Sequence, residues 1–192
     1  MRDLPVDEKQ APRIPPDAYF MRIAMAVRAR ADCLGNRIGA LITLDDHIVS
    51  TGYNGTPENM TNCSEGGCYR CAHREEYPSG TGYDLCICVH AEQNTLLAAA
   101  RFGISVQEGV LYTTMRPCFG CTKELLQAKI RKVLYLHDWT ALDGKKKAEY
   151  ERLQARFPDG INQLKISDPD EAWAVSAKKE EKTIDETGHG AS

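Results

Sequence analysis

Apolar residues recur along this chain at two spacings, one typical of helices and one typical of strands. Residues 16–31 show the helical spacing, which predicts a core-facing helix whose start Asp17 can cap. Its apolar positions are Tyr19, Phe20, Ile23, Ala24 and Val27. Further helices are predicted over 93–101, 118–130 and 145–157. The inward positions expected in the last of these are Ala148, Tyr150, Leu153 and Phe157.

Short apolar runs bounded by turn residues predict five strands. They cover residues 37–44, 48–54, 110–114, 132–137 and 161–166. The first two are expected to form a hairpin, and the continuous apolar run of the fourth suits a strand buried on both faces. The fifth is expected to run parallel to the fourth, joined to it through a helix. This order predicts an α/β fold, a three-layer α/β/α sandwich with a mixed five-stranded sheet.

Composition divides the chain into segments. Residues 1–15 hold several prolines among charges and are expected to be a flexible N-terminal lead. Residues 16–167 form the expected domain, within which 56–89 is a long insertion. Residues 168–192 are expected to be a charged C-terminal tail, where Trp173 anchors a last helix. The length of 192 residues is enough for one such domain with a real core.

Charge and hydropathy exclude some classes of protein. The formal net charge is −3, so the chain lacks the basic excess of a dedicated nucleic-acid binder. Its polar, charged start is not a signal peptide, and no apolar run approaches the ~20 residues of a membrane span. We therefore expect a cytoplasmic protein without a membrane partner. Eight cysteines in such a chain indicate metal ligands rather than disulfides.

Two short motifs carry the candidate chemistry. The first, Val-His-Ala-Glu, contains His90 and Glu92, and the second, Pro-Cys-Phe-Gly-Cys, contains Cys118 and Cys121. Each opens a predicted helix, whose N-terminus favours a thiolate. One imidazole and two thiolates suit a zinc ion that keeps a fourth position for water, and Glu92 can move the protons of that water. A lone Cys-x-x-Cys is often a redox pair or half of a structural site, but the two motifs together predict a catalytic zinc.

The insertion at 56–89 carries a second set of metal-binding side chains. A loop this long needs a function or another source of order. A structural zinc is the preferred source, since it can contribute ~10–16 kcal/mol, compared with ~5–15 kcal/mol for the stability of a whole domain. Buried free thiols are the alternative, and spacing does not fix which four side chains bind. The candidates are Cys63, Cys68, Cys71, His73, Cys86 and Cys88, with Cys33 just before the first strand.

Glycines also flank Tyr53 and Asn54 at the end of the second strand. In Gly-Tyr-Asn-Gly at 52–55, glycines on both sides of Asn54 allow the backbone to approach a ligand closely. A tight turn is the alternative interpretation.

Together these motifs resemble the cytidine/deoxycytidylate deaminase superfamily, most closely its dCMP deaminase branch. The His-x-Glu and Pro-Cys-x-x-Cys pair is the signature of zinc nucleobase deaminases. The Gly-Tyr-Asn-Gly segment separates this branch from free-nucleoside cytidine deaminases and from tRNA adenosine deaminases. The resemblance covers roughly residues 17–166. Besides the two motifs, it rests on residues 37–40, 50–57 and 77–80.

The resemblance implies roles for further residues. Asn54 is expected to contact the substrate, and Arg37 to lie near its phosphate. Tyr135 is expected to help form the wall of the base pocket, with ordinary core packing as the alternative. A second zinc near the active site, common in the family, implies the ligands Cys33, Cys63, Cys68 and Cys86. This chain adds cysteines to that pattern, so Cys71, His73 and Cys88 are alternative ligands.

The resemblance also implies a reaction and partners. The expected activity is hydrolytic deamination of dCMP to dUMP with release of ammonia, which feeds thymidylate synthesis. Water activated by zinc would attack C4 of cytosine, while Glu92 moves protons to N3 and to the departing amine. Family members are usually homo-oligomers, here expected to be a hexamer or a dimer. Many members are allosteric, activated by dCTP and inhibited by dTTP.

Two other functions stay open. One is a related zinc deaminase acting on another nucleotide, a nucleic-acid base, or a pterin- or riboflavin-type intermediate. The acidic balance and the Gly-Tyr-Asn-Gly segment argue against a nucleic-acid partner. The other is a non-enzymatic, zinc-stabilised binding module of the competence type, linked to DNA uptake. The intact Glu92 argues against this module, since a purely structural site does not need it.

Overall fold

The computed structural model describes residues 12–77, 81–139 and 144–175, so most of the predicted N-terminal lead and C-terminal tail lies outside the described residues. Five strands form one sheet in the order β2-β1-β3-β4-β5. Strand β1 pairs antiparallel with β2 and β3, whereas β3, β4 and β5 run parallel. The strands are β1 Gly39–Leu44, β2 His47–Tyr53, β3 Val110–Met115, β4 Lys132–His137 and β5 Ile161–Gln163. The predicted mixed five-stranded sheet is confirmed.

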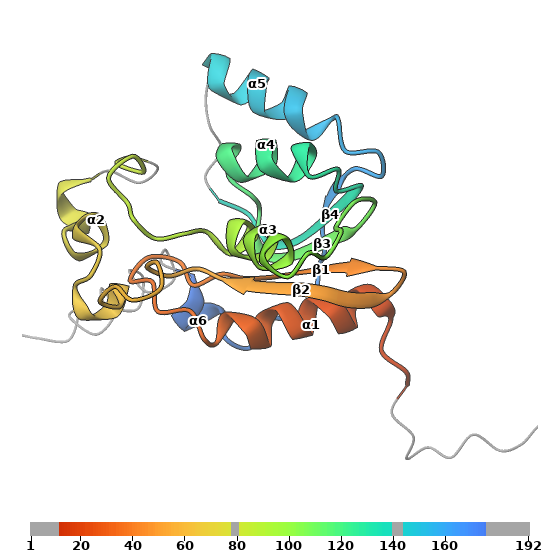
Figure 1. Ribbon diagram of the computed structural model, residues 1–192, viewed down its shortest axis with the longest axis horizontal. Helices are drawn as coiled ribbons and strands as arrows, with labels where there is room; N and C mark the ends of the chain where they lie inside the picture. The colour runs from red at the N-terminus through yellow and green to blue at the C-terminus, as the bar shows by residue number, and fades with distance from the viewer. Residues whose placement is uncertain (1–11, 78–80, 140–143, 176–192) are drawn as a thin grey trace, which may run out of the picture.

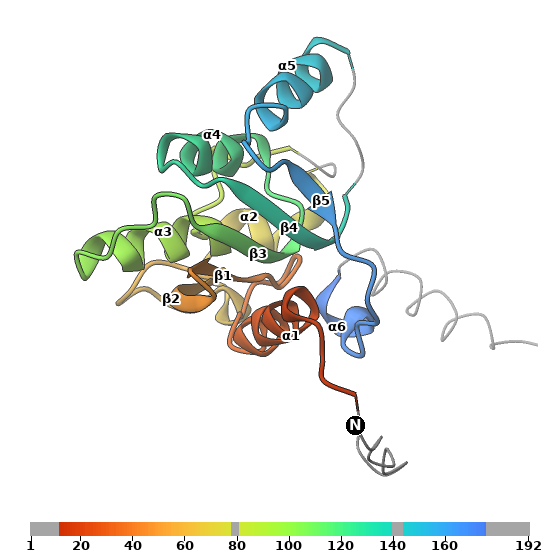
Figure 2. The same cartoon turned by 90° about the vertical axis from the view of Figure 1, so that its right-hand side faces the viewer.

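Helices cover both faces of this sheet (Figures 1 and 2). Helices α1 and α6 lie on one face, and α3, α4 and α5 lie on the other. The longer helices are α1 Pro16–Arg28, α3 Ala91–Arg101, α4 Phe119–Gln127 and α5 Gly144–Gln154. The shorter ones are α2 Tyr69–Ala72 and α6 Glu171–Ala174. The three layers of the predicted α/β/α sandwich are therefore present.

The core consists of two apolar clusters, one on each face of the sheet. Neighbouring residues of the same strands point to opposite faces, as strand geometry requires. Leu41, Tyr112 and Leu134 lie on the α1 side, and Ile42, Leu111 and Val133 lie on the α3 side. Strand β4 contributes to both clusters, which confirms its predicted burial on both faces.

The inward face of α1 differs from the predicted one. Phe20 and Ala24 are buried as predicted, but Tyr19 is 51% exposed. Arg28 is fully buried instead. Its Nη1 and Nη2 donate to the two carboxylate oxygens of Asp168, each at 2.7 Å. Arg28 can therefore lie on the core side of α1, because its charge is paired with that of Asp168, 140 residues away in sequence.

The start of α1 also differs from the prediction. Asp17 makes no capping hydrogen bond, and Pro15 occupies the N-cap position. The carboxylate of Asp17 instead accepts a hydrogen bond from the Tyr112 hydroxyl at 2.8 Å. This contact joins the first turn of α1 to β3.

Residues after 167 contact the rest of the domain. The Trp173 ring lies against the guanidinium groups of Arg28 and Arg37, at 5.4 and 5.5 Å. The expected last helix around Trp173 is present as α6. The domain boundary predicted after residue 167 therefore falls inside a stretch that packs on α1.

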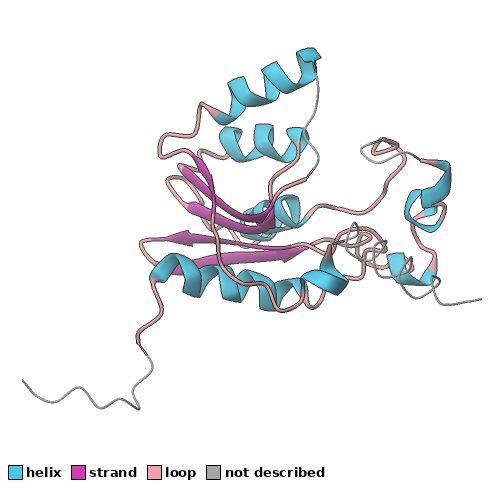
Figure 3. Ribbon diagram, turned by 180° about the vertical axis from the view of Figure 1, so that it is seen from behind, coloured by secondary structure: helices cyan, strands magenta, loops and turns pink. Residues whose placement is uncertain are grey.

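The insertion leaves the sheet after β2 and returns at α3 as loop with short helices (Figure 3). Its described part contains α2 and two 3-10 helices, η1 Cys63–Glu65 and η2 Arg74–Glu76. An antiparallel bridge between Gly55 and Val89 closes its base. No described helix combines the length and apolar character needed to cross a membrane.

Candidate metal and catalytic site

The N-termini of α3 and α4 meet beside the carboxyl end of β3. His90 is the N-cap residue of α3 and Cys118 that of α4, both with extended backbone, and Cys121 lies in the first turn of α4. The His90 N–H donates to Gln93 Oε1 at 3.0 Å, which closes the first turn of α3. Gln93 Nε2 then donates to Glu124 Oε1 at 3.0 Å and joins the two helices. The two sequence motifs are thereby brought together, as predicted.

The donor atoms of this site fit a tetrahedral zinc ion. His90 Nδ1 lies 3.5 Å from Cys118 Sγ and 3.4 Å from Cys121 Sγ. Tetrahedral zinc bonds of about 2.0–2.1 Å to nitrogen and about 2.3 Å to sulfur place such ligands about 3.6 Å apart. The hydrogen bond with Cys121 lowers the pKa of Cys118 to about 4, and a bond from His90 adds to this. Cys118 is therefore suited to the thiolate form that binds zinc.

Glu92 lies behind these donors and is 2% exposed. Burial raises the pKa of its carboxyl above the ordinary value, because a buried charge loses hydration. The Thr113 hydroxyl on β3 donates to Glu92 Oε1 at 3.2 Å. The sheet thus orients a carboxyl group that can take up and release a proton.

The residues predicted to contact substrate lie in different surroundings. Asn54 is 5% exposed, and its Oδ1 accepts the Ile38 N–H at 2.7 Å while its Nδ2 donates to the Asn36 carbonyl at 2.9 Å. Its amide thus joins the end of β2 to the segment before β1. Substrate contact by Asn54 stays a prediction.

Arg37 and Tyr135 lie on opposite faces of the sheet. The Arg37 guanidinium lies over Trp173, next to α6. Tyr135 is half-buried and pairs in register with Thr113, so it shares the face on which Thr113 meets Glu92. This placement is compatible with a pocket wall for Tyr135, whereas Arg37 is held at α6.

Two residues that lie near the site, Thr113 and Tyr83, were not predicted from the sequence. Thr113 was predicted only as part of a strand, although the alternation along β3 indicates which face it occupies. Tyr83, in the insertion, lies edge-on to the His90 ring with the ring centroids 6.3 Å apart. No pattern in the sequence indicates this contact. It depends on how the backbone of the insertion folds back toward His90.

Gly52 serves helix packing. A Cβ atom there would lie 2.5 Å from Ala91 O and 2.5 Å from Thr95 N, both in the backbone of α3. The sequence predicted that the backbone near Asn54 comes close to a ligand. At Gly52, the backbone of β2 instead comes close to the backbone of α3. Gly52, near the end of β2, therefore helps to hold the start of α3.

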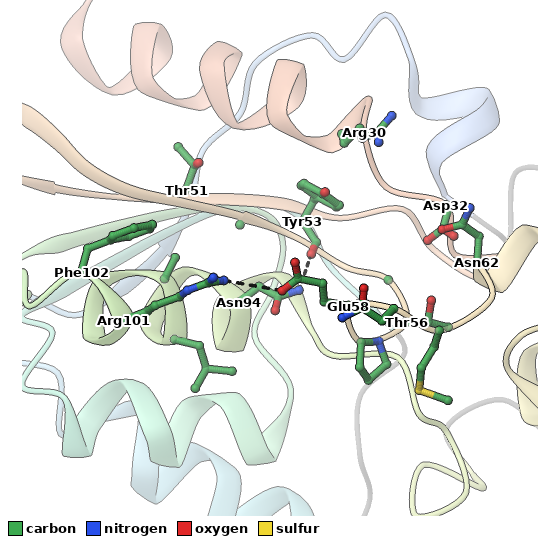
Figure 4. A pocket seen from close by; sticks show the side chains of 17 residues that line it. Arg30, Asp32, Thr51, Tyr53, Thr56, Glu58, Asn62, Asn94, Arg101 and Phe102 are labelled. Carbon is green, nitrogen blue, oxygen red and sulfur yellow. Dashed lines mark hydrogen bonds and ion pairs between the residues drawn. The ribbon is translucent and has the colours of Figure 1, made fainter.

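A cavity of about 620 Å³ lies beside α3, where residues of β2 and of the loop after β2 also line it (Figure 4). Asn94 donates to the Tyr53 carbonyl at 2.7 Å, and Arg101 pairs with Glu58 at 3.6 Å across it. Among the described residues that line it, neither the three zinc donors nor Glu92 appears. The cavity is thus separate from the chemistry at the N-terminus of α3.

The five cysteines of the insertion meet Cys33, but in a different grouping from the predicted one. Cys33 and Cys63 fall in one group of four sulfurs, whereas Cys68 and Cys86 fall in another. The four sulfurs of the predicted set are therefore divided between the two groups, and their role as ligands stays a prediction. His73 is turned away, since its ring stacks on Tyr69 at 4.0 Å. The two residues common to both groups are Cys71 and Cys88, which were predicted as alternatives.

Known proteins resemble this chain in both sequence and fold. Residues 15–137 match the family model of the cytidine and deoxycytidylate deaminase zinc-binding region. The chain is 39% identical over 119 residues to a deoxycytidylate deaminase of Schizosaccharomyces pombe, covering 62% of this chain and 36% of that protein. It is 34% identical over 127 residues to one of Mycobacterium phage D29, covering 62% of this chain and 92% of that protein.

A solved structure is similar as well. The dCMP deaminase of cyanophage S-TIM5 in apo form matches with a TM-score of 0.57 at 23% identity, covering 77% of this chain and 96% of that chain. This likeness concerns the fold. The chain spans only 36% and 40% of the lengths of the Schizosaccharomyces pombe and Saccharomyces cerevisiae relatives that it matches.

Proposed function

Because the chain belongs to the cytidine and deoxycytidylate deaminase family, we propose that it hydrolyses dCMP to dUMP and ammonia. The observation that carries this proposal is a buried carboxyl, Glu92, beside a three-donor set suited to zinc. A non-enzymatic zinc module has no use for such a carboxyl. The relatives named deoxycytidylate deaminase support the choice of dCMP among cytosine nucleotides.

His90, Cys118 and Cys121 would hold the zinc ion. When bound there, zinc supplies a Lewis acid that makes a coordinated water acidic near neutral pH. With three protein donors, the site would keep a fourth position open for water, as a catalytic zinc site does and a closed structural site does not.

Glu92 is assigned the proton transfers. Its carboxylate takes one proton from the attacking water and delivers it to N3 of the cytosine. It then takes the remaining proton from the new C4 hydroxyl and delivers it to the departing amine. Thr113 orients the carboxyl through its hydroxyl, which leaves the other oxygen of Glu92 available to the substrate. Water is consumed and ammonia leaves, so no further reactant is needed.

The base is proposed to lie between aromatic side chains. Tyr83 stands beside His90, and Tyr135 stands beside Thr113, so the two tyrosines approach the site from the insertion and from the sheet. Asn54 is proposed to contact the substrate and Arg37 to lie near its phosphate, as the family resemblance implies. We further propose a cytoplasmic homo-oligomer that responds to dCTP and dTTP, as the family resemblance implies.

Ammonia release from the zinc-loaded protein tests the proposal. The substrates compared are dCMP, CMP, deoxycytidine and dCTP, each with and without added dCTP or dTTP. Turnover of dCMP without turnover of deoxycytidine is expected, because the enzyme reads the phosphate. Release from none of the four by zinc-loaded protein would contradict the proposed substrate class.

A further inference from the structure

The described part of the insertion is built around sulfur. Its buried cluster, together with residue 33, consists of cysteines alone. Its large apolar side chains face solvent instead: Met60 at 50%, Tyr69 at 51%, Tyr83 at 56%, Leu85 at 45% and Ile87 at 37% exposure. Apolar burial therefore contributes little to the order of this segment. The sulfurs themselves must supply it.

These six sulfurs form two overlapping groups of four. One group is Cys33, Cys63, Cys71 and Cys88, and the other is Cys68, Cys71, Cys86 and Cys88. Within each group, the sulfur atoms all lie within 4.8 Å of one another. Cys71 and Cys88 belong to both groups, so six side chains provide two complete four-ligand sets.

The spacing of the sulfurs is that of metal ligands. Cys86 Sγ lies 3.8 Å from Cys68 Sγ and 3.8 Å from Cys71 Sγ. Zinc–sulfur bonds of about 2.3 Å place the sulfurs of a tetrahedral site about 3.8 Å apart. A disulfide would bring two sulfurs to about 2.05 Å, and all six cysteines are free. The sulfur spacings therefore fit ligands that share a metal ion rather than disulfides.

We propose that the insertion holds two zinc ions in one binuclear thiolate cluster. Cys33 and Cys63 are the terminal ligands of one ion, and Cys68 and Cys86 those of the other. Cys71 and Cys88 bridge the two ions. Their positions support this role, since Cys71 and Cys88 each interact with sulfurs of both groups.

Charge does not oppose a second ion. Six thiolates with two divalent ions carry a net charge of −2, the same as four thiolates with one ion. A single ion would leave two buried thiols beside it without a metal. Backbone amides offset the remaining charge, since the Leu34 N–H donates to Cys63 and the N–H groups of Cys71 and Ile87 donate to Cys68.

The cluster also lies next to the catalytic segment. Cys88 is two residues before His90, and Val89 between them pairs with Gly55 at the base of the insertion. Two bound ions would thus fix the backbone that delivers His90 to the catalytic zinc. The cluster is a structural support and takes no part in the reaction itself.

Metal counting tests the proposal independently of activity. The protein is reconstituted with zinc under reducing conditions, dialysed against metal-free buffer, and measured by elemental analysis and native mass spectrometry. Three zinc ions per chain are expected in the wild type. Two are expected in the double variant His90→Ala/Cys118→Ser, which lacks the catalytic site. If that variant fails to fold, the wild-type count alone decides between three ions and two.

Zinc-edge X-ray absorption then tests the bridging. The double variant should show sulfur ligands alone and a zinc–zinc vector of about 3 Å, as expected when two tetrahedra share an edge. Two zinc ions per wild-type chain, or one in the double variant, would overturn the binuclear cluster. So would the absence of a zinc–zinc vector in a sample that holds two ions.

Discussion

The buried pair between Arg28 and Asp168 gives the sharpest prediction of stability. The guanidinium makes two hydrogen bonds of 2.7 Å to the carboxylate, and the two side chains are 0% and 2% exposed. His137 Nε2 also lies 2.6 Å from the same carboxylate. We consider the substitution Asp168→Asn, which keeps the shape of the side chain and removes its charge.

The expected loss is large because the arginine stays buried, and its second acidic partner, Asp170 at 3.6 Å, is 42% exposed and offsets the charge only in part. Removing one partner of a buried ion pair leaves an uncompensated charge and costs about 3–5 kcal/mol. In a domain of this size each kcal/mol lowers Tm by about 2–4 °C, so the variant should melt roughly 6–20 °C below the wild type. The pair joins α1 to the segment after β5, so α6 should loosen first. Thermal unfolding followed by circular dichroism, with zinc present at neutral pH, measures the shift.

The chain supplies a matched control. Arg131 and Asp159 form a pair with the same 2.7 Å separation, but their side chains are 44% and 42% exposed. Solvent screens this pair, so Asp159→Asn should change Tm much less. Equal and small shifts in the two variants would refute the reasoning, because burial would then make no difference to the strength of the pair.

Two further substitutions test the support of the catalytic segment. Thr113→Val should lower kcat for dCMP about 10- to 100-fold, since a hydrogen bond to a charged group contributes about 1.5–3 kcal/mol, while Thr113→Ser keeps the hydroxyl and should restore turnover. Wild-type turnover in the valine variant would show that Thr113 does not position Glu92. Gly52→Ala should destabilise the protein by about 1–3 kcal/mol, because the added Cβ would meet the α3 backbone at 2.5 Å. An unchanged Tm, matching that of Thr51→Ala on the exposed side of β2, would argue against that contact.

Local patterns predicted much of the fold. The run at 133–136 is apolar at successive positions, and burial on both faces follows directly from that pattern. The two motifs predicted the catalytic donors for a similar reason. His90 and Cys118 each stand at a helix start, and two such starts can meet at one metal.

Long-range partners were not predictable in the same way. The inward face of α1 was misjudged because Arg28 is paired with Asp168, which follows it by 140 residues in sequence. Spacing also could not group Cys33 with the five cysteines of the insertion, since the grouping depends on how the loop and short helices fold back together. Cys71 and Cys88 appeared as substitutes in the sequence and lie at the centre of the cluster in the structure.

The most direct test of the proposed activity compares the wild type with Glu92→Gln on dCMP. Zinc content and ammonia release are measured on the same samples. Both proteins should hold the same amount of zinc, because Glu92 is not a ligand. The variant should release ammonia at least about 10²-fold more slowly, the lower end of the usual contribution of general acid–base catalysis. Equal ammonia release by the two proteins would contradict the assignment of proton transfer to Glu92.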